Sequence, residues 1–329
     1  MLSRRFIRTK VFQAIFAYRL SGNKDVAQAR KDLLESVEKL HQLFIYQLSL
    51  LPALGDFAKK KIEENKRKHL PTFADLHPNT RFVDNRVTKL LKNNIDLRYA
   101  QKKYGIDWSR HEDLLRKLFA VIQESKTYKE YLNSEDSFEN DKNVWIKIIK
   151  NHLYNFTLLK DLYEDMESVW GEDIITINSL IIKFIKSLNS DDDDFKKLPG
   201  LFYTDGATGT SPDKEFMLEL FDKTIEHTDE NKKLIESKVV NWDIERIPLT
   251  DMVILEMALT EILHFPTIPL KVTLNEYIEL SKKFSIPNNH IFVNGILDRL
   301  IAQLLKEGKI KKEGRGLIDS STRRAETSS

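Results

Sequence analysis

The sequence contains no cysteine, and this one absence excludes several kinds of functional site. Disulfides, thiolate zinc sites, iron–sulfur clusters and cysteine nucleophiles all require a thiol. Long apolar runs are lacking as well, because none approaches the ~18 residues that a membrane-spanning helix needs. The basic N-terminus also lacks the continuous apolar segment of a signal peptide. These absences lead us to expect a cytoplasmic protein with no membrane partner.

Glycine and proline are scarce: the 329 residues include 11 Gly and 9 Pro, and the segments between them are long. Because both residues interrupt helices, their scarcity predicts a mainly helical chain. Apolar residues make up 41% and charged residues 31% of the sequence, as in a globular protein. The net charge of +2 is too small to identify a partner. The composition therefore predicts the all-α class.

The most regular pattern lies between residues 284 and 305. Apolar residues recur there at the three- and four-residue steps of an amphipathic helix: Val293, Ile296, Leu297, Leu300, Ile301 and Leu304. Phe292 lies outside this apolar stripe, and Gly295 occupies the helix interior at a cost of ~1 kcal/mol relative to Ala. A segment that departs from its own pattern in this way is a candidate functional surface.

Capping and breaking residues predict where other helices begin and end. Pro52 and Gly55 predict a break in the helical segment from 25 to 68. The β-branched run 174–177 is compatible with a short strand, but the helical spacing behind it favours a helix. Two residue pairs have the spacing of capping boxes that open helices: Ser109 with Glu112, and Thr273 with Glu276.

The first predicted helix is strongly basic at its start. Arg4, Arg5, Arg8 and Lys10 crowd its first turns, and no acidic residue occurs before Asp25. A helix N-terminus favours negative charge, so this cluster destabilises the helix by itself. One interpretation is a basic end that is simply solvated. The other is a phosphate site made by the cluster and the free N–H groups of the first turn.

A second candidate site surrounds Phe292. Asn288, Asn289 and His290 precede it closely, and Gly295 leaves the helix surface flat. An exposed aromatic ring beside polar side chains suits stacking of single-stranded bases, worth ~1–3 kcal/mol per base. Packing of Phe292 against a neighbouring helix explains the same spacing equally well.

No catalytic or metal-binding set is found. The eight histidines are scattered, and the sequence contains no HExxH motif, no G-x-S-x-G elbow and no Rossmann fingerprint. The loop 205–210 has two glycines but no following Lys-Ser/Thr, so it does not match a P-loop. The run of aspartates at 191–194 is expected to be a solvated turn, because adjacent carboxylates point apart. We therefore expect no cofactor and no enzymatic activity.

Two parts of the sequence resemble the NusB family of transcription antitermination factors. The C-terminal part carries a highly specific combination: Leu274-Asn275-Glu276, followed by Phe292-Val293-Asn294-Gly295-Ile296-Leu297-Asp298. The N-terminal part is similar to the arginine-rich first helix of that family, with Arg4-Arg5, Arg8 and Gln13-Ala14-Ile15-Phe16. Together the two parts cover roughly residues 1–50 and 212–308.

The resemblance implies an all-helical protein of two small bundles that binds a boxA-type single-stranded RNA. It also implies partnership with the ribosomal small-subunit protein NusE, through which the RNA polymerase elongation complex reads through terminators. The residues expected to bind RNA are Arg4, Arg5, Arg8 and Lys10, with Gln13, on the first helix, and Asn288, Asn289, His290 and Phe292 near the last. The residues expected to lie toward the NusE-like partner are Phe16, Leu20 and Asp251.

The predicted organisation has four parts. They are the basic helix and first helices of a NusB-like domain at 1–54, a helical insertion at 55–210, the C-terminal bundle at 211–308 and a disordered tail at 309–329. The insertion has no counterpart in compact family members, so it could add a surface, occupy the partner site or change the RNA partner. The family also often has Arg where Glu256 stands and Gly where Ser285 stands.

Two other functions fit part of the pattern. NusB-like domains also precede cytosine RNA methyltransferase domains, but such enzymes need cysteines for covalent attack on the base. This sequence has none, and it leaves no room for a cofactor domain after residue 308. The other alternative is a protein-interaction scaffold on the same fold, which uses the inserted helices to bind a protein and has no RNA role.

Overall fold

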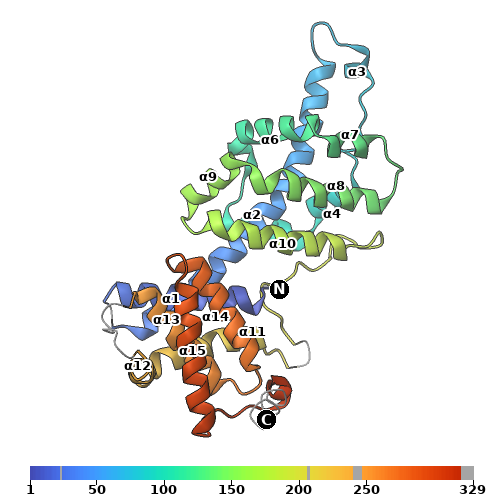
Figure 1. The fold of residues 1–329 in the computed structure, drawn as a ribbon. Coiled ribbons are helices and arrows are strands. Elements are labelled where there is room, and N and C mark those ends of the chain that lie inside the picture. The colour runs from blue at the N-terminus through green and yellow to red at the C-terminus, as the bar shows by residue number, and fades with distance from the viewer. Residues whose placement is uncertain (23, 206–207, 240–246, 320–329) are drawn as a thin grey trace. The chain divides into compact units, whose positions relative to one another are not determined.

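The computed structural model describes residues 1–22, 24–205, 208–239 and 247–319, and all regular structure within them is helical (Figure 1). The prediction of an all-α protein is confirmed. The helices of the first part of the chain are α1 (Arg4–Leu20), α2 (Val26–Lys66), α3 (Phe73–Leu76), α4 (Arg86–Asn93), α5 (Ile95–Tyr104), α6 (Glu112–Glu124), α7 (Lys126–Leu132), α8 (Phe138–Asn151), α9 (Thr157–Met166) and α10 (Trp170–Ser187). Those of the last part are α11 (Pro212–Glu226), α12 (Thr228–Glu236), α13 (Leu249–His264), α14 (Leu270–Phe284) and α15 (Asn289–Lys306). Short 3-10 helices lie at η1 (Trp108–His111), η2 (Leu153–Asn155) and η4 (Gly314–Asp319).

No helix in these ranges is both long and apolar enough to cross a bilayer.

The helices form two compact units, here called unit 1 and unit 2. Unit 1 comprises residues 37–201, and unit 2 comprises residues 2–36 together with 202–329. The divisions therefore fall inside α2 and after residue 201, whereas the sequence predicted them after residues 54 and 210. Unit 2 brings the basic N-terminal helix into the same body as the C-terminal helices.

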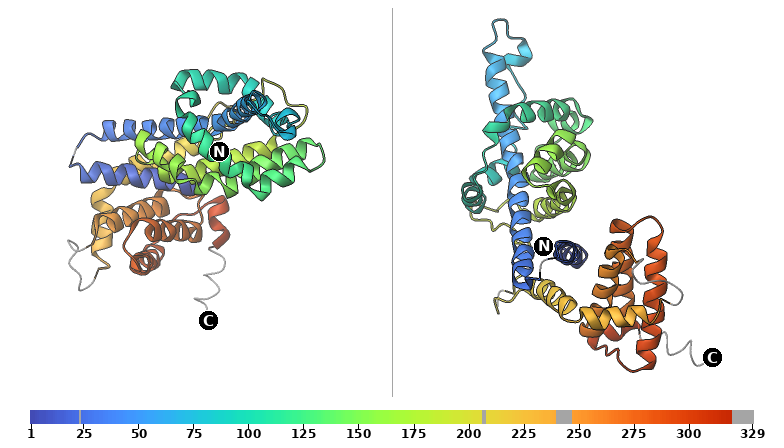
Figure 2. Two further views of the ribbon diagram at one scale, coloured as in Figure 1. Left: turned by 90° about the horizontal axis from the view of Figure 1, so that it is seen from above. Right: turned by 90° about the vertical axis from the view of Figure 1, so that its left-hand side faces the viewer.

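Helix α13 is the centre of unit 2. It contacts α1, α11, α12, α14 and α15, and every residue from Asp251 to Ile262 is buried. A helix that is surrounded on all sides needs apolar residues on every face, which explains its nearly continuous apolar sequence. The orange and red helices of Figure 2 are the C-terminal members of this bundle. Three carboxylates are buried within α13, at Asp251, Glu256 and Glu261, so each needs a polar partner.

Unit 1 is built along the second part of α2 (Figure 2). The buried side chain of Gln47 in α2 donates to Asn178 of α10 at 2.8 Å, and it accepts from the hydroxyl of Tyr163 in α9 at 2.6 Å. The run 174–177 lies inside α10, which confirms the prediction of helix there. Side-chain hydrogen bonds of this kind fix the register between the long helix and its neighbours.

The predicted break in α2 does not occur, because the helix continues through Pro52 and Gly55. Leu48, Leu51 and Leu54 around the proline are completely buried. Their burial contributes ~1.5–3 kcal/mol each, which offsets the ~3 kcal/mol cost of proline in a helix interior. A Cβ atom at Gly55 would lie 2.6 Å from a methyl carbon of Thr88, so the glycine allows α4 to pack closely against α2.

Neither predicted capping box forms. Ser109 lies within η1, where its backbone N–H donates to Asp107, and α6 begins at Glu112 without a side-chain cap. Helix α14 begins a turn before Thr273, so Thr273 and Glu276 both lie inside it. The tertiary structure uses their side chains for other partners, which are described below.

The segment after α15 is folded as far as η4, although the sequence predicted a disordered tail over 309–329. The backbone N–H of Glu313 donates to the carbonyl oxygen of Pro266 at 3.0 Å. The amine of Lys312 donates to the carbonyl oxygen of Phe265, also at 3.0 Å. These bonds hold the segment against the loop between α13 and α14. The rest of the predicted tail lies outside the described residues.

Candidate nucleic-acid interface

Helix α1 begins with two exposed arginines, and each pairs with a carboxylate from another helix of unit 2. Ser3 caps the helix through its side-chain oxygen. Arg4 donates from Nε to Asp213 of α11 at 3.2 Å, and Arg5 donates two hydrogen bonds to Glu276 of α14, at 3.0 and 2.9 Å. The two arginine side chains are 45% and 59% exposed. Exposed ion pairs contribute only ~0–1 kcal/mol, so these arginines can change partners.

Arg8 has a different environment, because its side chain is only 3% exposed. It donates to both carboxylate oxygens of Glu261, at 2.7 and 2.8 Å. The hydroxyls of Thr273 and Tyr277 donate to the same carboxylate, at 2.8 and 3.2 Å. Burial alone would lower the pKa of Arg8, but the hydrogen bond and charge of Glu261 raise it above its usual range. Arg8 therefore holds α1 against α13, which differs from the phosphate-binding role expected for it.

Glu256 stands where the family often has Arg, and a further arginine of α1 pairs with it. Arg19 donates to the buried carboxylate of Glu256 in α13, with one bond of 3.0 Å, and to the hydroxyl of Thr228 at 2.9 Å. Burial raises the pKa of Glu256, and the guanidinium of Arg19 opposes that rise. Ser285 stands where the family often has Gly. Its φ of −96° is a conformation that requires no glycine, so serine fits there without strain.

A cavity of about 590 Å³ lies beside the N-terminal turn of α1. Its wall includes Arg4, Arg5, Glu276 and, from η4, the exposed Arg315. Positive side chains beside a helix N-terminus favour a bound anion, because the helix dipole and the free N–H groups act in the same direction. We call this feature the arginine cavity. It is a candidate phosphate site in unit 2.

The turn between α14 and α15 carries the asparagines expected to meet bases. Asn288 is exposed and has φ +70°, in the left-handed region that asparagine tolerates better than most residues. Asn289 donates from its side-chain amide to Asp251 at 2.5 Å. Asp251 is completely buried at the start of α13, so it fixes the beginning of α15. It therefore does not lie on the surface, as was expected of a partner contact.

The surface around Phe292 combines partly exposed aromatic and exposed aliphatic groups. Phe292 is neither fully buried nor fully exposed. Ile286 and Ile291 nearby are 62% and 66% exposed. A Cβ atom at Gly295 would meet no atom within 4 Å, so the helix surface is open there. Gly295 lies three residues after Phe292, so this open part of the helix surface is close to the ring in sequence.

Helix α14 connects the basic helix to α15. Arg5 of α1 pairs with Glu276 of α14, and Phe12 of α1 lies 4.8 Å from Phe284 of α14 between ring centres. Helix α14 also packs against α15. Helix α14 therefore lies next to both α1 and α15 within unit 2.

The remaining expected residues on α1 differ in accessibility. Lys10 is buried, with its amine 5.4 Å from the ring centre of Phe6, so its placement does not suit a phosphate ligand. Gln13 is half-buried. Phe16 stacks on Phe12 with ring centres 5.9 Å apart and is half-buried, whereas Leu20 at the helix end is 69% exposed.

The sequence did not reveal two kinds of participant, the carboxylate partners of the arginines and one further arginine. The carboxylates of Glu261 and Glu276 are the partners of the arginines, and their helical spacing carried no sign of that role. Glu276 was instead assigned to a capping box. Arg315 was placed in a disordered tail, because its position depends on backbone bonds to the loop at Pro266.

These features define an all-helical protein whose arginine-bearing first helix packs on a buried central helix. Comparison with known proteins agrees with this class. The family model described as NusB family matches residues 180–302. Three similar relatives are each named transcription antitermination protein NusB. They come from Salinibacter ruber (39% identical, covering 33% of this chain and 68% of the relative), Chloroherpeton thalassium (32%, covering 32% and 50%) and Thermodesulfovibrio yellowstonii (40%, covering 29% and 64%).

The chain therefore belongs to the NusB family. The matched segments span between half and about two thirds of the lengths of these relatives. No solved structure matches the chain significantly. The residues before 180, which include almost all of unit 1 and the whole of α1, lie outside the family match.

Proposed function

We propose that this chain is a non-catalytic transcription antitermination factor that binds boxA-like single-stranded RNA together with a NusE-like ribosomal protein. The observation that carries the proposal is the arginine cavity, located in the same unit as the open surface of α15. The names of the relatives, which describe transcription antitermination proteins, support the same role.

The phosphate contacts in this proposal come from Arg4, Arg5 and Arg315. The first two are engaged by Asp213 and Glu276 through exposed ion pairs, which cost little to break. An incoming phosphate replaces each carboxylate as the acceptor, and arginine suits this exchange because its planar fork binds phosphate with two bonds. Arg8 takes no part, since removing Glu261 from it would leave a buried charge unpaired.

The base contacts in this proposal come from Phe292, Asn288 and His290. A half-exposed ring offers a stacking surface to a base, and the neighbouring polar groups can bond to base edges. The open surface at Gly295 leaves room for a nucleotide to lie against α15.

The protein partner in this proposal meets the far end of α1. Leu20 supplies an exposed apolar contact there, and Phe16 supplies a partly exposed aromatic one. Apolar and aromatic anchors are typical of the centre of a protein interface. Asp251 contributes only by holding Asn289 and the start of α15 in place.

Fluorescence anisotropy with a labelled boxA-like RNA, with and without the ribosomal partner, tests the proposal. Replacing both Arg4 and Arg5 by Gln should weaken binding and reduce the salt dependence, by ~1.4 in the slope of log K against log salt for two lost contacts on a single strand. A matched control replaces both Lys126 and Lys160 by Gln, because these lysines are exposed and paired with glutamates in unit 1. The control should bind RNA like the parent. Equal binding by the double arginine variant and the parent would reject the phosphate assignment.

Phe292→Ala tests the base contact separately. We expect it to weaken RNA binding by ~1–3 kcal/mol while the helical content and unfolding midpoint stay close to those of the parent. A variant that loses its fold would instead show that the ring is a packing residue. RNA binding that is unaffected in a folded variant would remove Phe292 from the site.

A further inference from the structure

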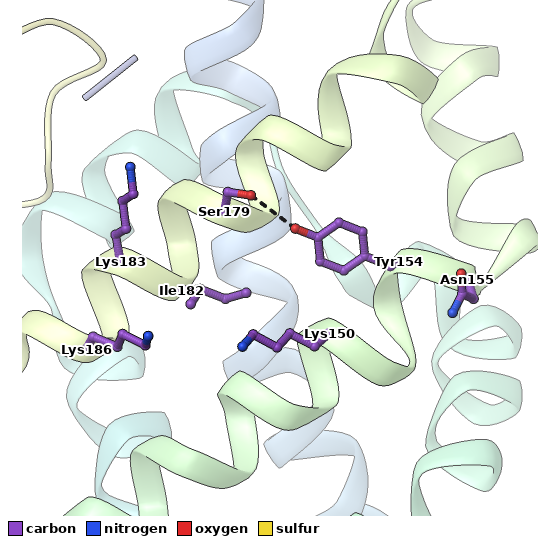
Figure 3. Close-up of a pocket in the computed structure, with 7 residues that line it drawn as sticks. All are labelled: Lys150, Tyr154, Asn155, Ser179, Ile182, Lys183 and Lys186. Atoms are coloured by element: carbon purple, nitrogen blue, oxygen red, sulfur yellow. Dashed lines mark hydrogen bonds between the residues drawn. The ribbon is translucent and has the colours of Figure 1, made fainter. Parts of the chain in front are cut away.

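A basic groove lies on unit 1, between the end of α8, η2 and α10 (Figure 3). Its volume is about 540 Å³. Lys150 of α8 lies on one side, and Lys183 and Lys186 of α10 lie on the other. All three are exposed, and no carboxylate belongs to the lining. We call these three residues the groove lysines.

The groove lysines are not neutralised. Within the described ranges, none of the three forms an ion pair, although neighbouring lysines do. Lys142 on α8 lies 2.9 Å from Glu139, and Lys147 lies 3.9 Å from Glu130. The difference means that positive charge is concentrated at the groove while the adjacent surface is balanced.

The amines of Lys150 and Lys186 are arranged to favour a bound anion, whereas that of Lys183 points away from them (Figure 3). Ser179, Lys183 and Lys186 follow one another at steps of four and three, so they share one face of α10. Figure 3 shows the amines of Lys150 and Lys186 directed toward one another across the groove. Like charges that face each other repel, and an anion between them converts the repulsion into attraction.

Two hydroxyls add hydrogen-bonding capacity to the same wall. The hydroxyl oxygens of Tyr154 and Ser179 are 3.1 Å apart, and either group can be the donor. Both also lie within hydrogen-bond distance of the carbonyl oxygen of Ile175. Because the pair can exchange donor and acceptor roles, one hydrogen can turn toward an oxygen atom of a ligand. Lysines and hydroxyls together are the usual ligands of a nucleic-acid backbone.

We propose that this groove binds the phosphate backbone of single-stranded RNA, as a second contact separate from the arginine cavity. An acidic protein segment is a weaker fit, because protein interfaces are built around apolar anchors and the aliphatic residue here, Ile182, is only 8% exposed. The choice of RNA as the nucleic acid rests on the proposed function. The site itself rests on the lining of the groove, in which Lys150, Tyr154 and Ser179 lie outside the family match and Lys183 and Lys186 lie within it.

The test uses the full chain and a long oligouridine RNA, whose binding depends on the backbone. Replacing the three groove lysines by Gln should weaken binding at low salt about tenfold and lower the salt slope by ~2. The matched control replaces Lys66, Lys126 and Lys160 by Gln, since each is exposed in unit 1 and already paired with a glutamate. The control should bind like the parent, and circular dichroism should show both variants folded.

The Arg4→Gln, Arg5→Gln variant measured in parallel separates this proposal from the proposed function. Loss of binding in the arginine variant alone overturns the groove proposal and leaves the proposed function intact. Loss in the groove variant alone supports the groove and counts against the arginine cavity. Unchanged binding in both variants overturns both. Uridine monophosphate provides the last arm: if it competes as strongly as the oligomer, the groove is a nucleotide site and not a backbone site.

Discussion

Arg8 and Glu261 form an ion pair in the core of unit 2, with two hydrogen bonds of 2.7 and 2.8 Å and side-chain exposures of 3% and 0%. Thr273 and Tyr277 complete the shell of the carboxylate. The first helix of the chain is thereby attached to its central helix through a network in which every charge is matched. Helix α1 therefore contains two kinds of arginine: Arg8 is buried and builds the fold, whereas Arg4 and Arg5 are exposed.

Arg8→Met should lower the free energy of unfolding by ~3–5 kcal/mol, because it leaves the Glu261 carboxylate buried without a cation. Arg5→Met should cost no more than ~1 kcal/mol, because its pair with Glu276 is exposed. Urea unfolding followed by circular dichroism measures both values. The double variant Arg8→Met, Glu261→Met should be more stable than Arg8→Met alone. Equal effects of the two single arginine variants would contradict the division between them.

The helical class and the family could be predicted from the sequence, because they depend on local spacing and on a distinctive C-terminal motif. The course of α2 could not. Pro52 is a helix breaker by its own chemistry, and only the burial of the leucines around it, a tertiary effect, keeps the helix continuous. The reason for a glycine at position 55 is also tertiary, because a Cβ atom there would collide with Thr88 of another helix.

The candidate site was predicted in outline only. The spacing of Thr273 and Glu276 is that of a capping box, and nothing local distinguishes a cap from a partner for a distant arginine. Likewise, Arg4 and Arg8 are four residues apart and share one face of α1, and both lie over the ring of Phe216. Arg8 is buried because it meets Glu261 of α13, whereas Arg4 in the first turn stays exposed, and this difference depends on tertiary packing.

Gly295→Ala should raise the free energy of unfolding by up to ~1 kcal/mol, because alanine is the better helix former and its Cβ would meet no atom within 4 Å. Thermal or urea unfolding measures the change. If α15 also presents this place to RNA, the same variant should bind boxA-like RNA more weakly while being more stable. Gly55→Ala is the contrasting control, and it should destabilise the protein because its Cβ would lie 2.6 Å from Thr88.

The free energy of unfolding should rise at alkaline pH, because Lys312 loses its proton more easily in the folded chain than in the unfolded chain. Burial lowers its pKa to about 8 in the folded chain, below the ordinary value of 10.5, and the charge of Glu261 opposes that shift. Between these two values the unfolded chain binds more protons than the folded chain, so the free energy of unfolding increases with pH in that window. Below pH 8 the cost of burying the charged amine is fully present. Lys312→Met should flatten this rise in unfolding experiments at pH 7 to 10, and an unchanged slope would show that another group titrates.

Glu276→Gln should strengthen RNA binding if the phosphates exchange with carboxylates in the arginine cavity. Glu276 holds Arg5 through two hydrogen bonds and lies 3.8 Å from Arg8, so its charge competes directly with an incoming phosphate. Its side-chain hydrogen bond also raises the pKa of Arg5, as expected of a bound counter-charge. Since the pair contributes ~0–1 kcal/mol, removing the charge should improve the dissociation constant by up to about fivefold.

Glu164→Gln is a matched control for this experiment, because Glu164 pairs with the exposed Lys160 in unit 1 at 3.4 Å. Both variants change the net charge by one, so a general electrostatic effect on RNA would improve the two equally. A local exchange improves only Glu276→Gln, and the improvement should disappear when Arg5 is also replaced by Gln. Weaker binding by Glu276→Gln would mean that the carboxylate positions Arg5 for RNA instead of competing with it.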